Sequence, residues 1–556
     1  MINFDIAAVP FSRYGSYLAI SQLPQRDARV AGIYLRTMHG DAPNREICRF
    51  EIVGDDSATL QITASPATLR LSTHGGYIDI CFADVHTLHI RSNGLSLRLV
   101  FTHGDYDQAI ARSGGWQINS FSNRIVCALL PLRGNLTIDA PWCVERAEHI
   151  VAECRDDVEF LLGECHDSWP QHWLNTKASF AQHRQNVADE FKDWLNKTPQ
   201  IPARYRAARE LAAYIQWSTV VAPNGLLMRP AMLMSKNWLT AVWSWDHCFN
   251  AMALSYGNAE LGWQQLLLPF DFQRANGALP DCVNDTNLIW NFCKPPIQGW
   301  ALRWLMKRNL LDGAQLKEIY APLSRWTEWW LRERADNRDG LPQYNHGNDS
   351  GWDNSTLFDG GMPIATPDLS AFLIVQMQTL ADIARHLQKP RAAKQWQRRA
   401  DELLQRMLAT YWRDDHFVAM RECEPVASQT LLLLMPIVLA QQLPVAVRKI
   451  LVETIQQQFL TAHGLASESP HSPHYVSDGY WRGPIWAPVT LLIVDALVAI
   501  DEHQLAATIA ERFCALAQRS GMAENYEALT GAPLRDRAHT WSASVFLILA
   551  HEYLPR

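Results

Sequence analysis

The sequence predicts a mainly α-helical protein that begins with an antiparallel β-sandwich domain. Two observations lead to this prediction. Apolar residues alternate with period two up to about residue 165, and they recur at helical spacing from about residue 170. The chain has 556 residues, which exceeds the roughly 100–200 residues of a single domain. We therefore expect a β-sandwich over 1–165, a linker helix region over 166–200 and a helical domain over 201–556.

Short alternating segments define the β region. LQIT from Leu60, YIDICF from Tyr77 and LSLRLVF from Leu95 each place apolar side chains on one face of a strand. Turn sequences such as THGG and RSNG separate them, as expected for an antiparallel sheet. Only two of the 22 tryptophans, Trp116 and Trp142, precede position 165, and no residue in this region suggests catalysis.

The helical region contains the clearest single element, predicted over 366–387. Thr366 is a suitable N-cap, a proline follows at the first helical position, and apolar residues then recur at steps of three and four. Periodicity alone leaves the arrangement of the helices open. Further helices are predicted near 204–220, 314–335, 391–411, 427–441, 444–460, 484–500, 503–519 and 540–553.

Composition excludes several classes of protein. The formal net charge is -7 and there is no basic cluster, so we expect no nucleic-acid partner. The start of the chain lacks a basic segment and an unbroken apolar run, so we expect no signal peptide. No run of about 18 apolar residues is present, so we expect no membrane span. The 11 cysteines lack C-x-x-C spacing, which is typical of reduced thiols and favours a cytoplasmic location. The histidines lack metal-binding spacing, so we expect no metal and no other cofactor.

Four polar connectors rich in tryptophan and acidic residues interrupt the helices. They read NWLTAVWSWDHCFN, DSGWDNSTLFDG, DGYWRGPIWAP and AENYEALTG. Indole rings pack on the apolar faces of sugars while polar groups bind the hydroxyls. Cleaving a glycosidic bond needs one protonated acid and one carboxylate, and an apolar tryptophan wall raises the pKa of the acid. Trp352 precedes Asp353 in this way. Each acid alone is more simply a turn or capping residue, but four such connectors together predict a carbohydrate-active site.

These connectors also carry a family resemblance. GWDNS, GYWRGPIW and ENYEALTG, with WSWDH upstream, resemble glycoside hydrolase family 63, and DSGWD is similar to the ESGWD of family 37 trehalases. The resemblance covers roughly residues 200–553, and the order and spacing of the four segments agree. It implies an (α/α)6 barrel with the site in loops at one end. It further implies Asp353 as general acid and Glu524 as general base, with Glu527 as the second candidate for the base.

The same resemblance implies a set of substrate-binding residues. Lys294 and Thr356 depart from the family pattern, which commonly has Gln and Pro there. Lys294 could pair with Asp246 or bind an acidic aglycone such as glycerate, and Arg482 could contact sugar hydroxyls or shape its loop. The predicted substrate-binding residues are Trp243, Trp245, Asp246, Lys294, Trp352, Asp359, Tyr480, Trp481, Arg482, Gly483 and Trp486.

The function that the resemblance implies is hydrolysis, with inversion, of a terminal α-glucosyl bond in a small glucoside or oligosaccharide. One alternative is an (α/α)6-barrel disaccharide phosphorylase, in which phosphate replaces water and an anion pocket is needed. Another is a non-catalytic sugar-binding protein that has kept the aromatic residues. The expected partner is a small carbohydrate; the linkage, the aglycone and the oligomeric state stay open.

Overall fold

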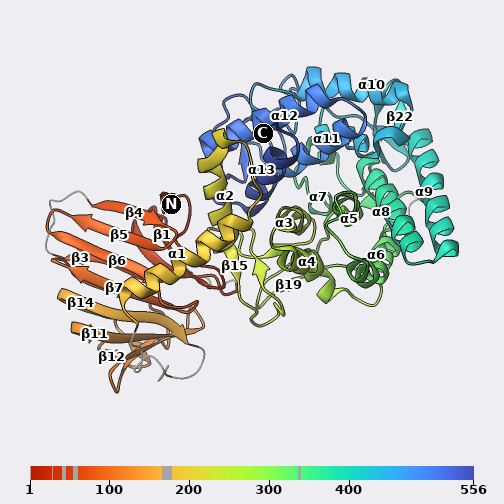
Figure 1. Cartoon of the computed structure of the whole chain (residues 1–556). Helices are drawn as coiled ribbons and strands as arrows, with labels where there is room; N and C mark the ends of the chain where they lie inside the picture. The colour runs from red at the N-terminus through yellow and green to blue at the C-terminus, as the bar shows by residue number, and fades with distance from the viewer. Residues whose placement is uncertain are drawn as a thin grey trace. The chain divides into compact units, whose positions relative to one another are not determined.

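The structure is a computed structural model that describes residues 2–27, 29–40, 45–53, 60–165, 169, 178–335 and 340–555. It divides into two compact units (Figure 1). We call Met1–Asn196, Ala213–Thr240 and Asp285–Asn287 the β unit, and Lys197–Ala212, Ala241–Asn284 and Leu288–Arg556 the barrel unit. Residues 166–168 and 170–177 of the expected linker region lie outside the described residues. The domain boundaries at 165 and 200 stay a prediction.

The β unit is built on one 12-stranded antiparallel sheet, which confirms the predicted antiparallel β domain (Figure 1). Its alternating residues are buried on one face: Leu69 and Leu71 in β5 are fully buried, while Arg70 between them is exposed. Two long strands, β11 and β14, pair along most of their length, and β14 also pairs with β8 and β7. The strands are β1 (Leu18–Leu23), β2 (Gly32–Thr37), β3 (Glu46–Val53), β4 (Gln61–Ser65), β5 (Thr68–Thr73), β6 (Gly76–Phe82), β7 (Thr87–Asn93), β8 (Ser96–Phe101), β9 (Gln108–Arg112), β10 (Gly115–Ser120), β11 (Ile125–Asp139) and β14 (Val151–Cys165).

Helix α1 (Phe180–Lys197) and two pairs of short strands also belong to the β unit. Strand β12 (Trp142–Cys143) pairs with β13 (Arg146–Ala147), and β15 (Val220–Val221) pairs with β16 (Ala231–Met232). Helix α2 (Arg206–Thr219) begins in the barrel unit and ends in the β unit. All four residues of the β15–β16 pair are buried, so this hairpin belongs to the core of the β unit.

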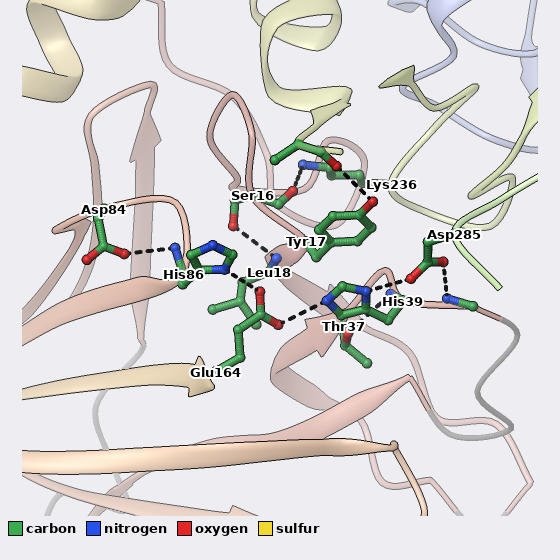
Figure 2. Close-up of polar contacts among 12 residues, drawn as sticks. Ser16, Tyr17, Leu18, Thr37, His39, Asp84, His86, Glu164, Lys236 and Asp285 are labelled. Carbon is green, nitrogen blue, oxygen red and sulfur yellow. Dashed lines mark hydrogen bonds and ion pairs between the residues drawn. The ribbon is translucent and has the colours of Figure 1, made fainter. Parts of the chain in front are cut away.

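A cluster of ionised side chains lies inside the β unit (Figure 2). His39 Nδ1 is 2.7 Å from Asp285 Oδ2, and His39 Nε2 is 3.5 Å from Glu164 Oε2. Glu164 Oε1 is 3.1 Å from His86 Nδ1. Burial opposes the charge on His39, but its bonds to the two carboxylates prevail and raise its pKa to about 9. Burial likewise opposes ionisation of Glu164, yet the two histidines lower its pKa to about 2.

Replacing His39 with Gln should therefore destabilise the protein most at low pH. The pKa of His39 is higher in the folded than in the unfolded state, so its stabilisation is complete below about pH 6.5 and disappears as the pH rises through about 9. The expected loss is at most about 3 kcal/mol in the free energy of unfolding. Urea denaturation at about pH 6 and about pH 9.5 measures it, with the exposed His103→Gln as the control. An equal loss at both pH values would show that charge is not the cause.

The barrel unit contains a closed inner ring of helices, which confirms the predicted (α/α)6 barrel (Figure 1). Each inner helix contacts the next, and the last contacts the first. Their residues are almost all buried because each helix is packed on every side. In order, the inner helices are α3 (Asp246–Leu254), α5 (Gln298–Lys307), α8 (Pro367–His386), the 3₁₀ helix η5 (Leu431–Gln442), α11 (Ala487–Ala499) and α13 (Thr540–Glu552).

Outer helices cover this ring. They include α4 (Ala259–Leu267), α6 (Gly313–Glu333), α9 (Pro390–Tyr411), α10 (Val445–Thr454) and α12 (His503–Ser520). In α9 the buried residues recur at steps of three and four, so the outer helices carry the amphipathic pattern that the sequence displays. Among the described residues, no helix is both long and apolar enough to cross a membrane.

Two predicted helices differ from the expectation, and two helices of nine and ten residues were missed. The helix predicted over 427–441 is the 3₁₀ helix η5, whose Ala440 has a non-helical φ of 50°. The helix predicted over 444–460 ends at Thr454 and continues as a π-helical turn to Phe459. Helices α4 and α5 were missed because they are buried on most sides and show no clear apolar stripe.

Candidate active site

Asp353 follows a tight turn in the barrel unit. The short helix α7 (Gly347–Ser350) ends at Gly351, which has a left-handed φ of 72°. A Cβ at this position would lie 2.6 Å from the Trp245 ring, so only glycine fits. The chain then buries Trp352 and leaves the Asp353 side chain 31% exposed. The glycine thus lets the chain leave the helix and present a carboxylate.

A buried carboxylate, Asp349, fixes this segment. Its Oδ2 accepts hydrogen bonds from the backbone N–H groups of Asn345 (3.0 Å) and His346 (3.1 Å). Its Oδ1 accepts one from Cys293 N (3.0 Å), and the Arg334 guanidinium lies 3.2 Å from Oδ2. Every oxygen of Asp349 is used in this way, so its role is to hold the loop and the neighbouring FCKPP segment together.

Two side chains join the GWDNS loop to the GYWRG loop. The Asn354 amide donates to Gly479 O (3.0 Å) and accepts from Trp481 N (3.0 Å). Arg482 donates from Nε to Asn354 O (2.8 Å), and its guanidinium pairs with Asp359. These contacts favour the loop-shaping interpretation of Arg482.

Two smaller contacts act on the same loops. Gly483 N donates to Ser467 Oγ (3.0 Å). Thr356, at the position where the family commonly has proline, donates to Glu468 Oε2 (2.8 Å), which lies on a fully buried carboxylate. This departure from the family pattern therefore provides a hydrogen bond.

The tryptophans of these loops pack on one another. The rings of Trp481 and Trp486 stack with centroids 4.0 Å apart, and Trp352 packs on Trp481 at 4.7 Å. Trp245 meets Trp541 edge to face at 5.9 Å. All five rings are at most 5% exposed, so they form an apolar layer beneath the loops. Their predicted contact with substrate stays a prediction. Trp243, in strand β17 (Val242–Trp243), is only partly buried.

One ammonium group lies among several carboxylates in the barrel unit. Lys294 Nζ is 3.2 Å from Asp281 Oδ1 and 3.9 Å from Asp353 Oδ1, and it donates to Asn348 O (3.0 Å). Asp281 was not found from the sequence, because no motif marks it. Asp246 is influenced by Lys294 at longer range: burial raises the pKa of Asp246 to about 7, and the ammonium opposes this rise. The Oδ2 atom of Asp246 is buried without a hydrogen-bond partner among the described residues.

Glu524 lies in the last connector, and its backbone N–H donates to Asp536 O (2.7 Å). Its side chain accepts a hydrogen bond from the Tyr480 hydroxyl. Burial raises the pKa of Glu524 to about 7, and the charge of Asp536 adds to the rise. Burial also raises the pKa of Tyr480, and the charges of both Glu524 and Asp353 raise it further. Tyr480 is therefore close to both of the predicted catalytic carboxylates.

Glu527, the second candidate for the base, has a different environment. Its Oε1 accepts from the Tyr475 hydroxyl (2.9 Å), and its Oε2 accepts from Leu529 N (3.1 Å) and Thr530 N (2.5 Å). Burial opposes its ionisation, but these bonds prevail and lower its pKa. Such a carboxylate stabilises a turn, which favours Glu524 as the base.

The fold and the acidic, tryptophan-lined loops are those of a glycoside hydrolase with an (α/α)6 barrel. Residues 240–542 match the model of the family described as the mannosylglycerate hydrolase MGH1-like glycoside hydrolase domain, and the chain belongs to this family. It is thus an enzyme of glycoside hydrolase family 63, whose members invert the anomeric configuration.

Two curated relatives support this assignment. The mannosylglycerate hydrolase of Thermus thermophilus is 22% identical over 388 residues, which are 55% of this chain and 93% of that protein. The glucosylglycerate hydrolase of Mycolicibacterium hassiacum is 21% identical over 437 residues, which are 58% of this chain and 97% of that protein.

Two solved structures share the fold. A family 63 mannosylglycerate hydrolase from Thermus thermophilus, in complex with Tris and D-glycerate, has a TM-score of 0.55 at 20% identity, over 61% of this chain and 99% of that one. A bacterial glucoamylase complexed with acarbose has a TM-score of 0.64 at 12% identity, over 98% of this chain and 93% of that one.

Proposed function

We propose that this glycoside hydrolase is an exo-acting α-glucosidase that releases a terminal α-glucosyl unit from a small glucoside or oligosaccharide. Asp353 is the general acid and Glu524 the general base. The observation that supports this pair most directly is the position of Tyr480, which donates to Glu524 and also experiences the charge of Asp353.

The proposed reaction is a single displacement. Asp353 donates its proton to the glycosidic oxygen while the bond from that oxygen to the anomeric carbon breaks. Glu524 removes a proton from a water molecule, whose oxygen forms the new bond on the opposite face of the sugar. An inverting pair needs a gap of about 6.5–9.5 Å to admit this water. Burial gives Glu524 a pKa of about 7, which makes it a stronger base than an exposed glutamate.

Asp246 is the proposed anchor for the terminal sugar. It is 6% exposed, and its Oδ2 has no hydrogen-bond partner within the described residues. Buried carboxylate oxygens are normally paired, and a sugar hydroxyl is a suitable donor. The partly buried ring of Trp243, three residues earlier, could pack on the same sugar.

Three observations bear on the choice of aglycone, on the phosphorylase alternative and on the cellular compartment. The names of the two relatives refer to glycosides of glycerate, so glucosylglycerate belongs among the substrates to test. A phosphorylase needs a cation or backbone N–H groups to bind phosphate. Lys294 is instead engaged by aspartates and a backbone carbonyl, which weakens that alternative. The eleven cysteines are free thiols, which supports a reducing compartment such as the cytoplasm.

Proton NMR of the anomeric signals tests the proposal. A panel of α-glucosides, including disaccharides and glucosylglycerate, is incubated with the protein with and without phosphate. We expect β-glucose to appear first, because water attacks the face opposite the leaving group. Early α-glucose would contradict inversion, and glucose 1-phosphate that requires phosphate would identify a phosphorylase. Release of another sugar from its α-glycoside, with no turnover of any glucoside, would disprove the glucosyl specificity.

A further inference from the structure

We propose that Lys294 is a positioning residue that holds the proton donor Asp353 in place, rather than a binding site for an acidic aglycone. The inference rests on the proposed function, because it takes Asp353 as the general acid. It concerns one of the two positions at which this chain departs from the family pattern, where Lys294 stands in place of the usual amide.

The ammonium group of Lys294 is already engaged by oxygens of the protein. It carries three N–H groups, and it donates a hydrogen bond to Asn348 O. Three oxygens surround Nζ: Asn348 O at 3.0 Å, Asp281 Oδ1 at 3.2 Å and Asp353 Oδ1 at 3.9 Å. The side chain is only 7% exposed, so a carboxylate from solvent has little access to Nζ.

Lys294 belongs to the same hydrogen-bonded unit as the Asp353 loop. The preceding residue, Cys293, donates its N–H to Asp349, which also accepts two backbone bonds from the start of that loop. The bond from Lys294 Nζ to Asn348 O reaches helix α7 within the loop. The backbone and the side chain of one short segment therefore both hold the loop that carries Asp353.

Charge gives Lys294 its effect on Asp353. The carboxylates of Asp246, Asp281 and Asp353 all interact with this one ammonium group. Asp281 is 9% exposed and cannot move into solvent easily, whereas Asp353 is 31% exposed. If the ammonium is removed, the carboxylates should repel one another. Of the two aspartates that form ion pairs with Lys294, Asp353 is the more exposed, so it should be the one displaced. A displacement of about 1 Å at a catalytic group can cost about 100-fold in rate.

The test replaces Lys294 with Met, which keeps the length of the side chain and removes its charge. Two substrates are compared: the α-glucoside that the wild type hydrolyses in the NMR panel, and α-glucosyl fluoride, whose fluoride departs with little help from an acid. We expect kcat on the glucoside to fall about 100-fold with KM changed less than about threefold. The fall on the fluoride should be less than about tenfold, and activity on the fluoride also shows that the variant is folded.

A double variant identifies the residue through which Lys294 acts. If Lys294 acts through Asp353, then K294M should add almost nothing to the loss already caused by D353N on the glucoside. D-glycerate serves as the probe for an anion site, measured as an inhibitor of fluoride hydrolysis. Its inhibition constant should be the same for the wild type and K294M.

Several results would overturn the proposal. Weaker inhibition by D-glycerate in K294M would identify an anion site, and equal losses on both substrates would indicate a general structural role. Unchanged kinetics would remove Lys294 from the mechanism. Failure of the proposed function itself is distinguished by D353N alone: near-wild-type activity of that variant on the glucoside would reject Asp353 as the acid, whatever K294M does.

Discussion

Replacing Asp353 with Asn should lower kcat on an α-glucoside by about 10²–10⁴-fold and leave KM nearly unchanged. The amide keeps the size of the side chain but cannot donate a proton to the departing oxygen. The loss should be much smaller for α-glucosyl fluoride, because fluoride departs without protonation. Steady-state kinetics on both substrates measure the effect, and the melting temperature shows whether the variant is folded.

Asp359 provides the matched control for this experiment. It lies six positions further along the same loop, is 44% exposed and pairs with Arg482. Asp359→Asn removes a partly exposed ion pair that shapes the loop, so we expect kcat to change by less than about tenfold. A loss as large as that of Asp353→Asn, or near-wild-type turnover of Asp353→Asn, would contradict the assignment of the acid.

Replacing Glu524 with Gln should lower kcat by about 10²–10⁴-fold on every substrate, the fluoride included. A base is needed to activate the water whichever group leaves, so this pattern distinguishes the base from the acid. The pKa of Glu524 is raised to about 7, and only the ionised form accepts a proton. We therefore expect kcat/KM of the wild type to increase as the pH rises through about 7. A pH–rate profile measures this limb, and its absence would show that another group is the base.

Glu527→Gln separates catalysis from stability in the same connector. Glu527 accepts two backbone hydrogen bonds and one from Tyr475. Its amide variant should therefore lower the melting temperature and change kcat little. If instead Glu527→Gln abolished turnover in a folded protein while Glu524→Gln remained active, the base would be Glu527.

The fold could be predicted wherever the sequence shows the alternation of a strand or the three- and four-residue steps of a helix. The β strands alternate, and outer helices such as α9 show a stripe at steps of three and four. The inner helices α3 and α5 carry no such stripe, because most of their residues are buried, polar ones such as Asn250 and Gln298 included. A helix that is buried on nearly every side has no distinct polar face, so periodicity cannot mark it.

The loops of the site could be predicted from their motifs, but the contacts within them could not. Asp281 and Asp536 carry no local signal, and only the folded chain brings them to Lys294 and Glu524. The sequence pattern of a tryptophan beside an acid is the same whether the indole ring faces a sugar or the protein interior. The structure buries Trp352 against Trp481, a choice made by packing that no spacing of residues reveals.

The chain passes between the β unit and the barrel unit more than once, and this limits how the enzyme can be shortened. A fragment that begins at residue 201 would still contain residues 213–240 and 285–287, which belong to the β unit. It would expose the buried side chains of Val220, Val221, Ala231 and Met232, and it would leave Asp285 without His39. No single cut in the gene separates the β unit from the barrel unit. We therefore expect the barrel unit to be obtained as a folded protein only when these segments are redesigned as well.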